Sequence, residues 1–144
     1  MSTFSSKVIV NTDLETLWDI LVDKIRSPQK YVPGVKDVQI KEEYSELSVL
    51  REMTVSIGEN DKRVREFIFA DKKTRTVIFK LDNDPNFCGY VINTIYQSDD
   101  CLELEYLLQW TPKPGIDIPV PDLGEVILNA VVHTKEIAES NLSK

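Results

Sequence analysis

Residues that would build a metal site or a disulfide framework are scarce in this 144-residue chain. It has one histidine, His133, and two cysteines, Cys88 and Cys101. A single histidine cannot form a histidine-rich metal site, and two cysteines form at most one disulfide. The sequence therefore predicts free thiols, a cytoplasmic location, and neither a metal ion nor another cofactor.

Positive charge and long apolar runs are also lacking. The 17 basic residues are outnumbered by 24 acidic ones, and the net charge of −7 argues against nucleic acid or an anionic membrane as the main partner. No apolar run approaches the length that spans a bilayer, and no signal peptide is visible at the start. We expect no nucleic-acid binding, no membrane insertion, and a single domain over residues 1–144.

Two segments have the spacing of amphipathic helices. A capping box at residues 12–15 precedes apolar residues at helical spacing, so a helix is expected from about 13 to 26. Pro28 prevents the helix from continuing further. A proline-rich linker at 111–121 leads into a long C-terminal helix over about 122–141.

Between these helices the pattern predicts strands. The expected strands are 7–10, 35–42, 47–57, 62–70, 74–81, 87–97 and 101–110. The links between successive strands are short and polar, which is typical of hairpins. The fold class is therefore α+β, with an antiparallel meander.

The hairpin turns predict which side chains share a face. Pairing residues 57 with 62, 70 with 75, and 97 with 101 gives one face that is mostly apolar. That face carries Val49, Arg51, Met53, Val55, Val64, Glu66, Ile68, Val77, Phe79, Leu81, Tyr90, Ile92, Tyr96, Leu102, Leu104, Tyr106, Leu108 and Trp110. The C-terminal helix is the natural cover for this face, and a gap between the two could hold a ligand.

Glu66 is the unexpected member of the apolar face. A carboxylate there costs several kcal/mol unless it is paired, and Arg51 is predicted as a diagonal neighbour about 7 Å away. One interpretation is a polar anchor, in which Arg51 holds a ligand carboxylate or hydroxyl and Glu66 orients it. The other is an ion pair that satisfies itself within the wall of the sheet.

Five segments carry a resemblance to a known family. They are LWDILVDKIRSPQKYVPGV, LREMTV, VREFIF, GYVIN and LEYLLQWTP. Over residues 4–139 the chain resembles the AtaL-like subfamily of the START and Bet v 1-like (birch-pollen-allergen, or SRPBCC) superfamily. The resemblance implies a helix-grip fold: a curved antiparallel sheet wrapped on a long C-terminal helix, with an internal hydrophobic cavity. It brings no catalytic residue with it.

Three functions remain open at this stage. The first is non-enzymatic binding of a small hydrophobic, lipid-like or polyketide-like ligand by a monomer or homodimer. Its candidate ligand-binding residues are Arg51, Met53, Glu66, Ile68, Phe79, Tyr90, Ile92, Tyr106, Leu108, Ile127 and Val131. The second is a polyketide cyclase, aromatase or dehydratase in which Glu66, Arg51 or a cavity tyrosine transfers protons. The third is protein binding through exposed Phe67, Phe69 and Val91. His133 is expected at the surface.

Overall fold

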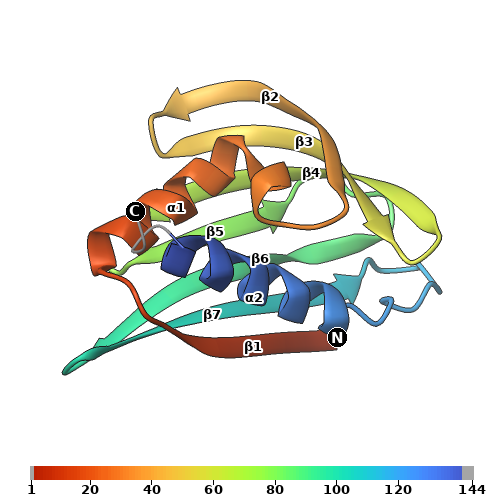
Figure 1. Cartoon of the computed structure of the whole chain (residues 1–144). Helices are drawn as coiled ribbons and strands as arrows, with labels where there is room; N and C mark the ends of the chain where they lie inside the picture. The colour runs from red at the N-terminus through yellow and green to blue at the C-terminus, as the bar shows by residue number, and fades with distance from the viewer. Residues whose placement is uncertain (1, 141–144) are drawn as a thin grey trace.

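The computed structural model describes residues 2–140 and shows one curved antiparallel sheet that wraps around two helices (Figure 1). The elements in chain order are β1 (Ser2–Val10), α1 (Leu14–Arg26), the 3₁₀ helix η1 (Pro28–Lys30), β2 (Val35–Ser45), β3 (Ser48–Ile57), β4 (Asn60–Asp71), β5 (Thr76–Leu81), β6 (Phe87–Ser98), β7 (Cys101–Pro112) and α2 (Gly124–Ser140). The strand order is β1-β7-β6-β5-β4-β3-β2. The predicted helix-grip fold is confirmed.

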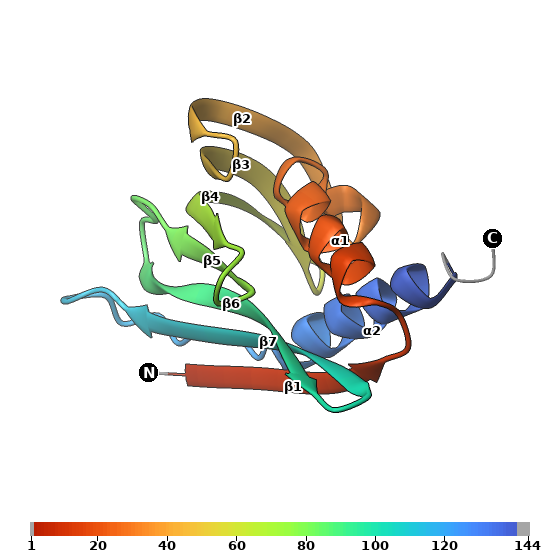
Figure 2. The same cartoon turned by 90° about the vertical axis from the view of Figure 1, so that its left-hand side faces the viewer.

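The two helices lie on the concave side of the sheet (Figure 2). The long helix α2 packs against β1 and β7, and α1 contacts α2. Leu17, Leu21 and Ile25 of α1 are fully buried, as their helical spacing predicts. The core therefore lies between the concave face of the sheet and the two helices.

Element boundaries lie within two residues of the expected ones, except at the ends of the chain and in β2, which extends to Ser45 instead of residue 42. β1 begins at Ser2 instead of residue 7, and it pairs with β7 from Ser2 opposite Trp110 to Val10 opposite Leu102. Its half-buried face carries serines as well as Phe4 and Val8, so its alternation is weak in the sequence. α2 begins at Gly124, and the expected last residue of this helix, residue 141, lies outside the described residues.

The faces of β3, β4 and β5 are as predicted, although the pairing is shifted by two residues. Ile57 pairs with Asn60 across a two-residue turn, so Arg51 lies directly opposite Glu66 instead of diagonal to it. Ile68 likewise pairs with Phe79. A shift of two residues changes the neighbours but keeps every side chain on its predicted face.

The predicted faces of β6 are wrong. Ser98 pairs with Cys101 across the two-residue turn at 99–100, whereas the expected link had three residues. This one-residue difference reverses the strand, so Tyr90, Ile92 and Tyr96 face outward. Val91, Asn93 and Ile95 take their places on the concave face, opposite Leu108, Tyr106 and Leu104.

Candidate functional site

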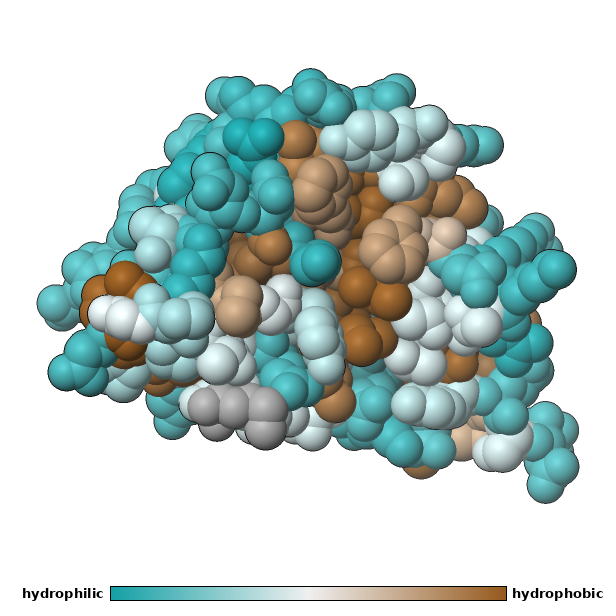
Figure 3. Space-filling view, turned by 180° about the vertical axis from the view of Figure 1, so that it is seen from behind, coloured by the Kyte–Doolittle hydropathy of each residue, from teal (hydrophilic) through white to brown (hydrophobic). Residues whose placement is uncertain are grey.

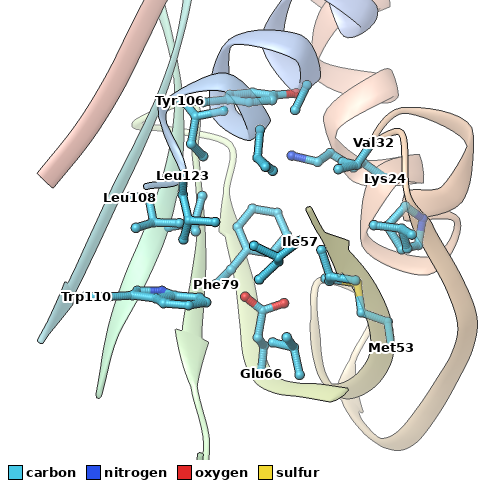
Figure 4. A pocket seen from close by; sticks show the side chains of 18 of the residues that line it. Lys24, Val32, Met53, Ile57, Glu66, Phe79, Tyr106, Leu108, Trp110 and Leu123 are labelled. Carbon is cyan, nitrogen blue, oxygen red and sulfur yellow. The ribbon is translucent and has the colours of Figure 1, made fainter. Parts of the chain in front are cut away.

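A cavity of about 100 Å³ lies between the concave face of the sheet and the helices (Figure 4). It is lined by Lys24, Pro28, Val32, Val35, Arg51, Met53, Val55, Ile57, Val64, Glu66, Phe79, Val91, Tyr106, Leu108, Trp110, Leu123, Val126, Ile127 and Ala130. This space is several times the minimum of about 10–15 Å³ that one water needs, so it can hold a small organic compound.

The cavity has a partly open side and a buried side. Met53, Val55 and Ile57 of β3 are only half-buried, as are Val32 after η1 and Val126 in the first turn of α2. These apolar side chains surround the open side. A ligand would enter between β3, the segment after η1, and the start of α2.

Arg51 occupies the buried side, where both terminal nitrogens are bonded to the protein, whereas its buried Nε has no hydrogen-bond partner among the described residues. Its Nη1 donates to the carbonyl oxygens of Lys24 and Ile25 at 3.1 and 2.8 Å, and its Nη2 donates to Glu66 Oε1 at 3.0 Å. The two carbonyls belong to the last turn of α1, where helical carbonyls lack partners and a cation is favoured. This geometry favours the structural interpretation of Arg51, which connects α1 to the sheet.

Among the described residues, Glu66 is the one carboxylate that lines the cavity. Its side chain is 5% exposed and paired with Arg51 through Oε1, while Figure 4 shows the carboxylate turned toward the cavity interior. Among residues 2–140, no hydrogen bond from the protein to its other oxygen, Oε2, is found. One carboxylate oxygen therefore remains to contact a ligand or water.

Lys24 is a charged cavity residue that the sequence analysis did not identify. It comes from α1, is 5% exposed, and donates from Nζ to Asn93 Oδ1 at 2.7 Å. The amine also lies 4.0 Å from the ring centre of Tyr106 and 4.9 Å from that of Phe79. Burial, with the nearby Arg51 cation, lowers the pKa of Lys24 to about 7, against a smaller opposing effect of Glu66.

A weak signal for Lys24 is present in the sequence. Lys24 lies seven residues after Leu17 and three after Leu21, so it falls on the apolar stripe of α1. The signal is weak because lysines at the edge of such a stripe usually extend their amine to solvent. Its partner Asn93 was assigned to the wrong face together with the rest of β6.

Tyr106 lines the cavity, but its hydroxyl is bonded away from it. The Thr134 hydroxyl donates to the Ala130 carbonyl, so the Tyr106 hydroxyl is the donor in its 2.8 Å bond to Thr134. Burial raises the pKa of Tyr106. Trp110 stacks on Phe87 with 5.6 Å between ring centres, and its buried Nε1 has no hydrogen-bond partner in the described part of the chain.

The other expected site residues fall into three groups. Met53, Phe79, Leu108 and Ile127 line the cavity together with Arg51, Glu66 and Tyr106. Ile68 and Val131 are buried in the core and do not line it. Tyr90 and Ile92 are on the outer face because of the reversed strand β6, so they are withdrawn as candidates.

Features outside the cavity have local roles. The Cys88 and Cys101 thiols are free, as predicted. The half-buried His133 places Nε2 3.2 Å from the Lys30 carbonyl oxygen. Asp84 is buried and paired with Lys62 at 2.7 Å.

The outer face of the sheet carries an apolar band (Figure 3). Phe69, Ile78, Ile92 and Leu107 pair in a row across four strands. Phe67 and Phe69 are exposed, as predicted. Val91 is not, because it points into the cavity.

Together, a concave sheet around a C-terminal helix with an apolar cavity defines the helix-grip fold. Residues 6–116 match the family model described as acetylaranotin biosynthesis cluster protein L (AtaL). The chain belongs to the AtaL family. A comparison with curated protein sequences found no match.

Solved structures share this fold at low sequence identity. The di-domain aromatase/cyclase StfQ of the steffimycin pathway superposes with a TM-score of 0.80 at 14% identity, over 99% of this chain and 52% of that one. Major latex-like protein 151 of Panax ginseng gives 0.75 at 12% identity, covering 95% and 97%. A START superfamily protein of Mycobacterium smegmatis gives 0.70 at 16%, covering 98% and 97%.

The structure has no described helix with the length and apolar character needed to cross a membrane.

Proposed function

We propose that this protein binds a small hydrophobic molecule in the cavity between its sheet and α2, as a non-enzymatic binding protein. The observation that carries the proposal is the composition of the cavity wall. Aliphatic and aromatic side chains form most of it, and only Lys24, Arg51 and Glu66 are charged. Apolar walls with a few fixed polar groups are typical of small-molecule sites.

Two observations support binding over proton-transfer catalysis. The guanidinium of Arg51 is engaged with α1 and Glu66, and the Tyr106 hydroxyl is bonded to Thr134. Two of the three groups considered for a cyclase mechanism are therefore committed to the fold. An aromatase/cyclase such as StfQ shares the fold at 14% identity, which carries no reaction to this chain.

A variant that fills the cavity tests the proposal. Ala130 lines the cavity from α2 and is 4% exposed, so the ring of Ala130→Phe would occupy the space of a ligand. We expect 2-naphthamide, an uncharged two-ring probe, to bind the wild-type protein and to bind this variant at least about tenfold more weakly. Isothermal titration calorimetry measures both affinities.

The matched control is Leu128→Phe. Leu128 is on the same helix but 44% exposed, so the added ring points away from the cavity. This control should bind 2-naphthamide like the wild type, and circular dichroism checks that both variants fold, since overpacking costs about 1–3 kcal/mol. Equal binding by all three proteins, or none by the wild type, would contradict the proposal.

A further inference from the structure

The cavity is lined by two basic side chains, Lys24 and Arg51, but by a single carboxylate, that of Glu66, among the described residues. Arg51 and Glu66 form an ion pair at 3.0 Å, whereas Lys24 has no carboxylate within 4.0 Å among the described residues. With all three groups ionised, the buried side carries one excess positive charge. A buried charge without a counter-ion is costly, so this arrangement favours a neutral amine or an anion supplied from outside.

The position of Lys24 determines where such an anion would lie. Figure 4 shows the amine turned into the cavity from the side of α1, while Glu66 enters from the sheet. Asn93 takes one of the three ammonium hydrogens, and the rings of Tyr106 and Phe79 lie beside the amine. An acceptor group on a ligand can contact the amine and remain apart from the Glu66 carboxylate.

We infer that the ligand of this cavity is a hydrophobic acid, whose ionised oxygen binds the Lys24 amine while its apolar body lies against the aliphatic wall. The inference rests on the proposed binding function and specifies its ligand class. A carboxylate, or the oxygen of an acidic enol or phenol, supplies the missing negative charge. A charge-assisted hydrogen bond in an apolar site is among the strongest polar contacts available.

Charged groups on several elements face Lys24 and set its protonation. Burial lowers the pKa of Lys24 most, Arg51 of β3 lowers it further, and Glu66 of β4 raises it. Tyr106 of β7 presents its ring to the amine, and burial raises the pKa of its hydroxyl. A bound anion adds a second negative charge near the amine. Acid binding near pH 8 should therefore be accompanied by uptake of up to one proton by Lys24.

A pair of ligands with the same shape tests the inference. We expect 2-naphthoic acid to bind the wild-type protein about tenfold or more tightly than 2-naphthamide, which differs only in lacking the charge. In Lys24→Met, which keeps the chain length without the amine, the preference should disappear while 2-naphthamide still binds. Calorimetry at pH 8 in buffers of different ionisation enthalpy measures the affinities and the proton uptake.

The possible outcomes separate this inference from the function on which it rests. If the amide binds and the acid is not preferred, the acid class is refuted and cavity binding stands. If the acid is preferred equally by the wild type and by Lys24→Met, the contact between the anion and the Lys24 amine is refuted. If neither compound binds, both proposals fail. Should Lys24→Met not fold, proton uptake by the wild type decides: uptake with the acid alone supports the inference, and its absence refutes it.

Discussion

Three charged side chains, Lys24, Arg51 and Glu66, are buried beside the cavity. Arg51 satisfies two carbonyls of α1 and one oxygen of Glu66, so its burial connects a helix to the sheet. Lys24 has an amide and two aromatic rings as partners but no carboxylate among residues 2–140. Of the two interpretations of the Arg51–Glu66 pair, the hydrogen bonds of Arg51 favour the structural one. Our proposal assigns the ligand contact to Lys24.

The sequence contained part of this cluster. Glu66 and Arg51 were found because a strand alternates strictly, so a charged residue at an inward position stands out. Lys24 was missed because a long flexible side chain on a helix can turn its amine either inward or outward. The direction depends on tertiary structure, which places Asn93 of β6 and Tyr106 of β7 beside the amine.

Buried Lys24 should make stability depend on pH. Between about pH 7 and 10.5 the unfolded chain keeps this amine protonated and the folded protein does not, so the unfolded state binds more protons. The free energy of unfolding should therefore rise with pH, by about 2 kcal/mol from pH 7 to 9 through this group. Urea denaturation of the wild type and of Lys24→Met at both values measures it.

The comparison with Lys24→Met removes the effect of every other titrating group. The wild type should gain about 2 kcal/mol more than the variant as the pH rises. If the free energy of unfolding changes equally with pH in the two proteins, the Lys24 amine stays protonated in the folded state. The buried side of the cavity would then keep its excess positive charge.

At the scale of single strands, prediction succeeded where only one face is apolar. β7 has alternating buried Leu102, Leu104, Tyr106, Leu108 and Trp110, and its face was assigned correctly. β6 has apolar residues on both faces, because its outer side contributes to the apolar band. The prediction of which face of β6 is buried therefore depended only on the length of the β6–β7 turn. A difference of one residue in that turn exchanges the two faces.

Gly89 in β6 is required by the close approach of β6 to β7. Its φ is +136°, and a Cβ there would lie 2.0 Å from the Gln109 carbonyl oxygen. We expect Gly89→Ala to lower the free energy of unfolding by about 3 kcal/mol or more, through both backbone strain and displacement of the neighbouring strand. Chemical denaturation measures the loss.

Gly58, in the β3–β4 turn, provides the control for this substitution. Its φ is also positive, at +63°, but nothing lies within 4 Å of the position of an added Cβ. Gly58→Ala should therefore cost only about 1 kcal/mol, from strain alone. Similar losses for the two variants would mean that the contact with β7 is unimportant.

At the scale of the whole molecule, the curvature of the sheet creates the cavity. The concave face is wider than α2 can cover, and α1 with η1 closes only part of the remaining space, so the side chains of β3 stay half-buried. The helix-grip arrangement followed from the order of elements and from the family resemblance. The volume and shape of the cavity did not, because they depend on strand pairing and helix position to within one residue.

The location of ligand binding is the central claim, and methyl NMR tests it most directly. On titration with 2-naphthamide, we predict shifts of the cavity methyl groups of Val91, Val126 and Ile127, with contacts to the probe's ring protons. The methyl groups of Ile78 and Ile92 on the outer face should not move. The reverse pattern, with the outer face shifted and the cavity unchanged, would contradict the account.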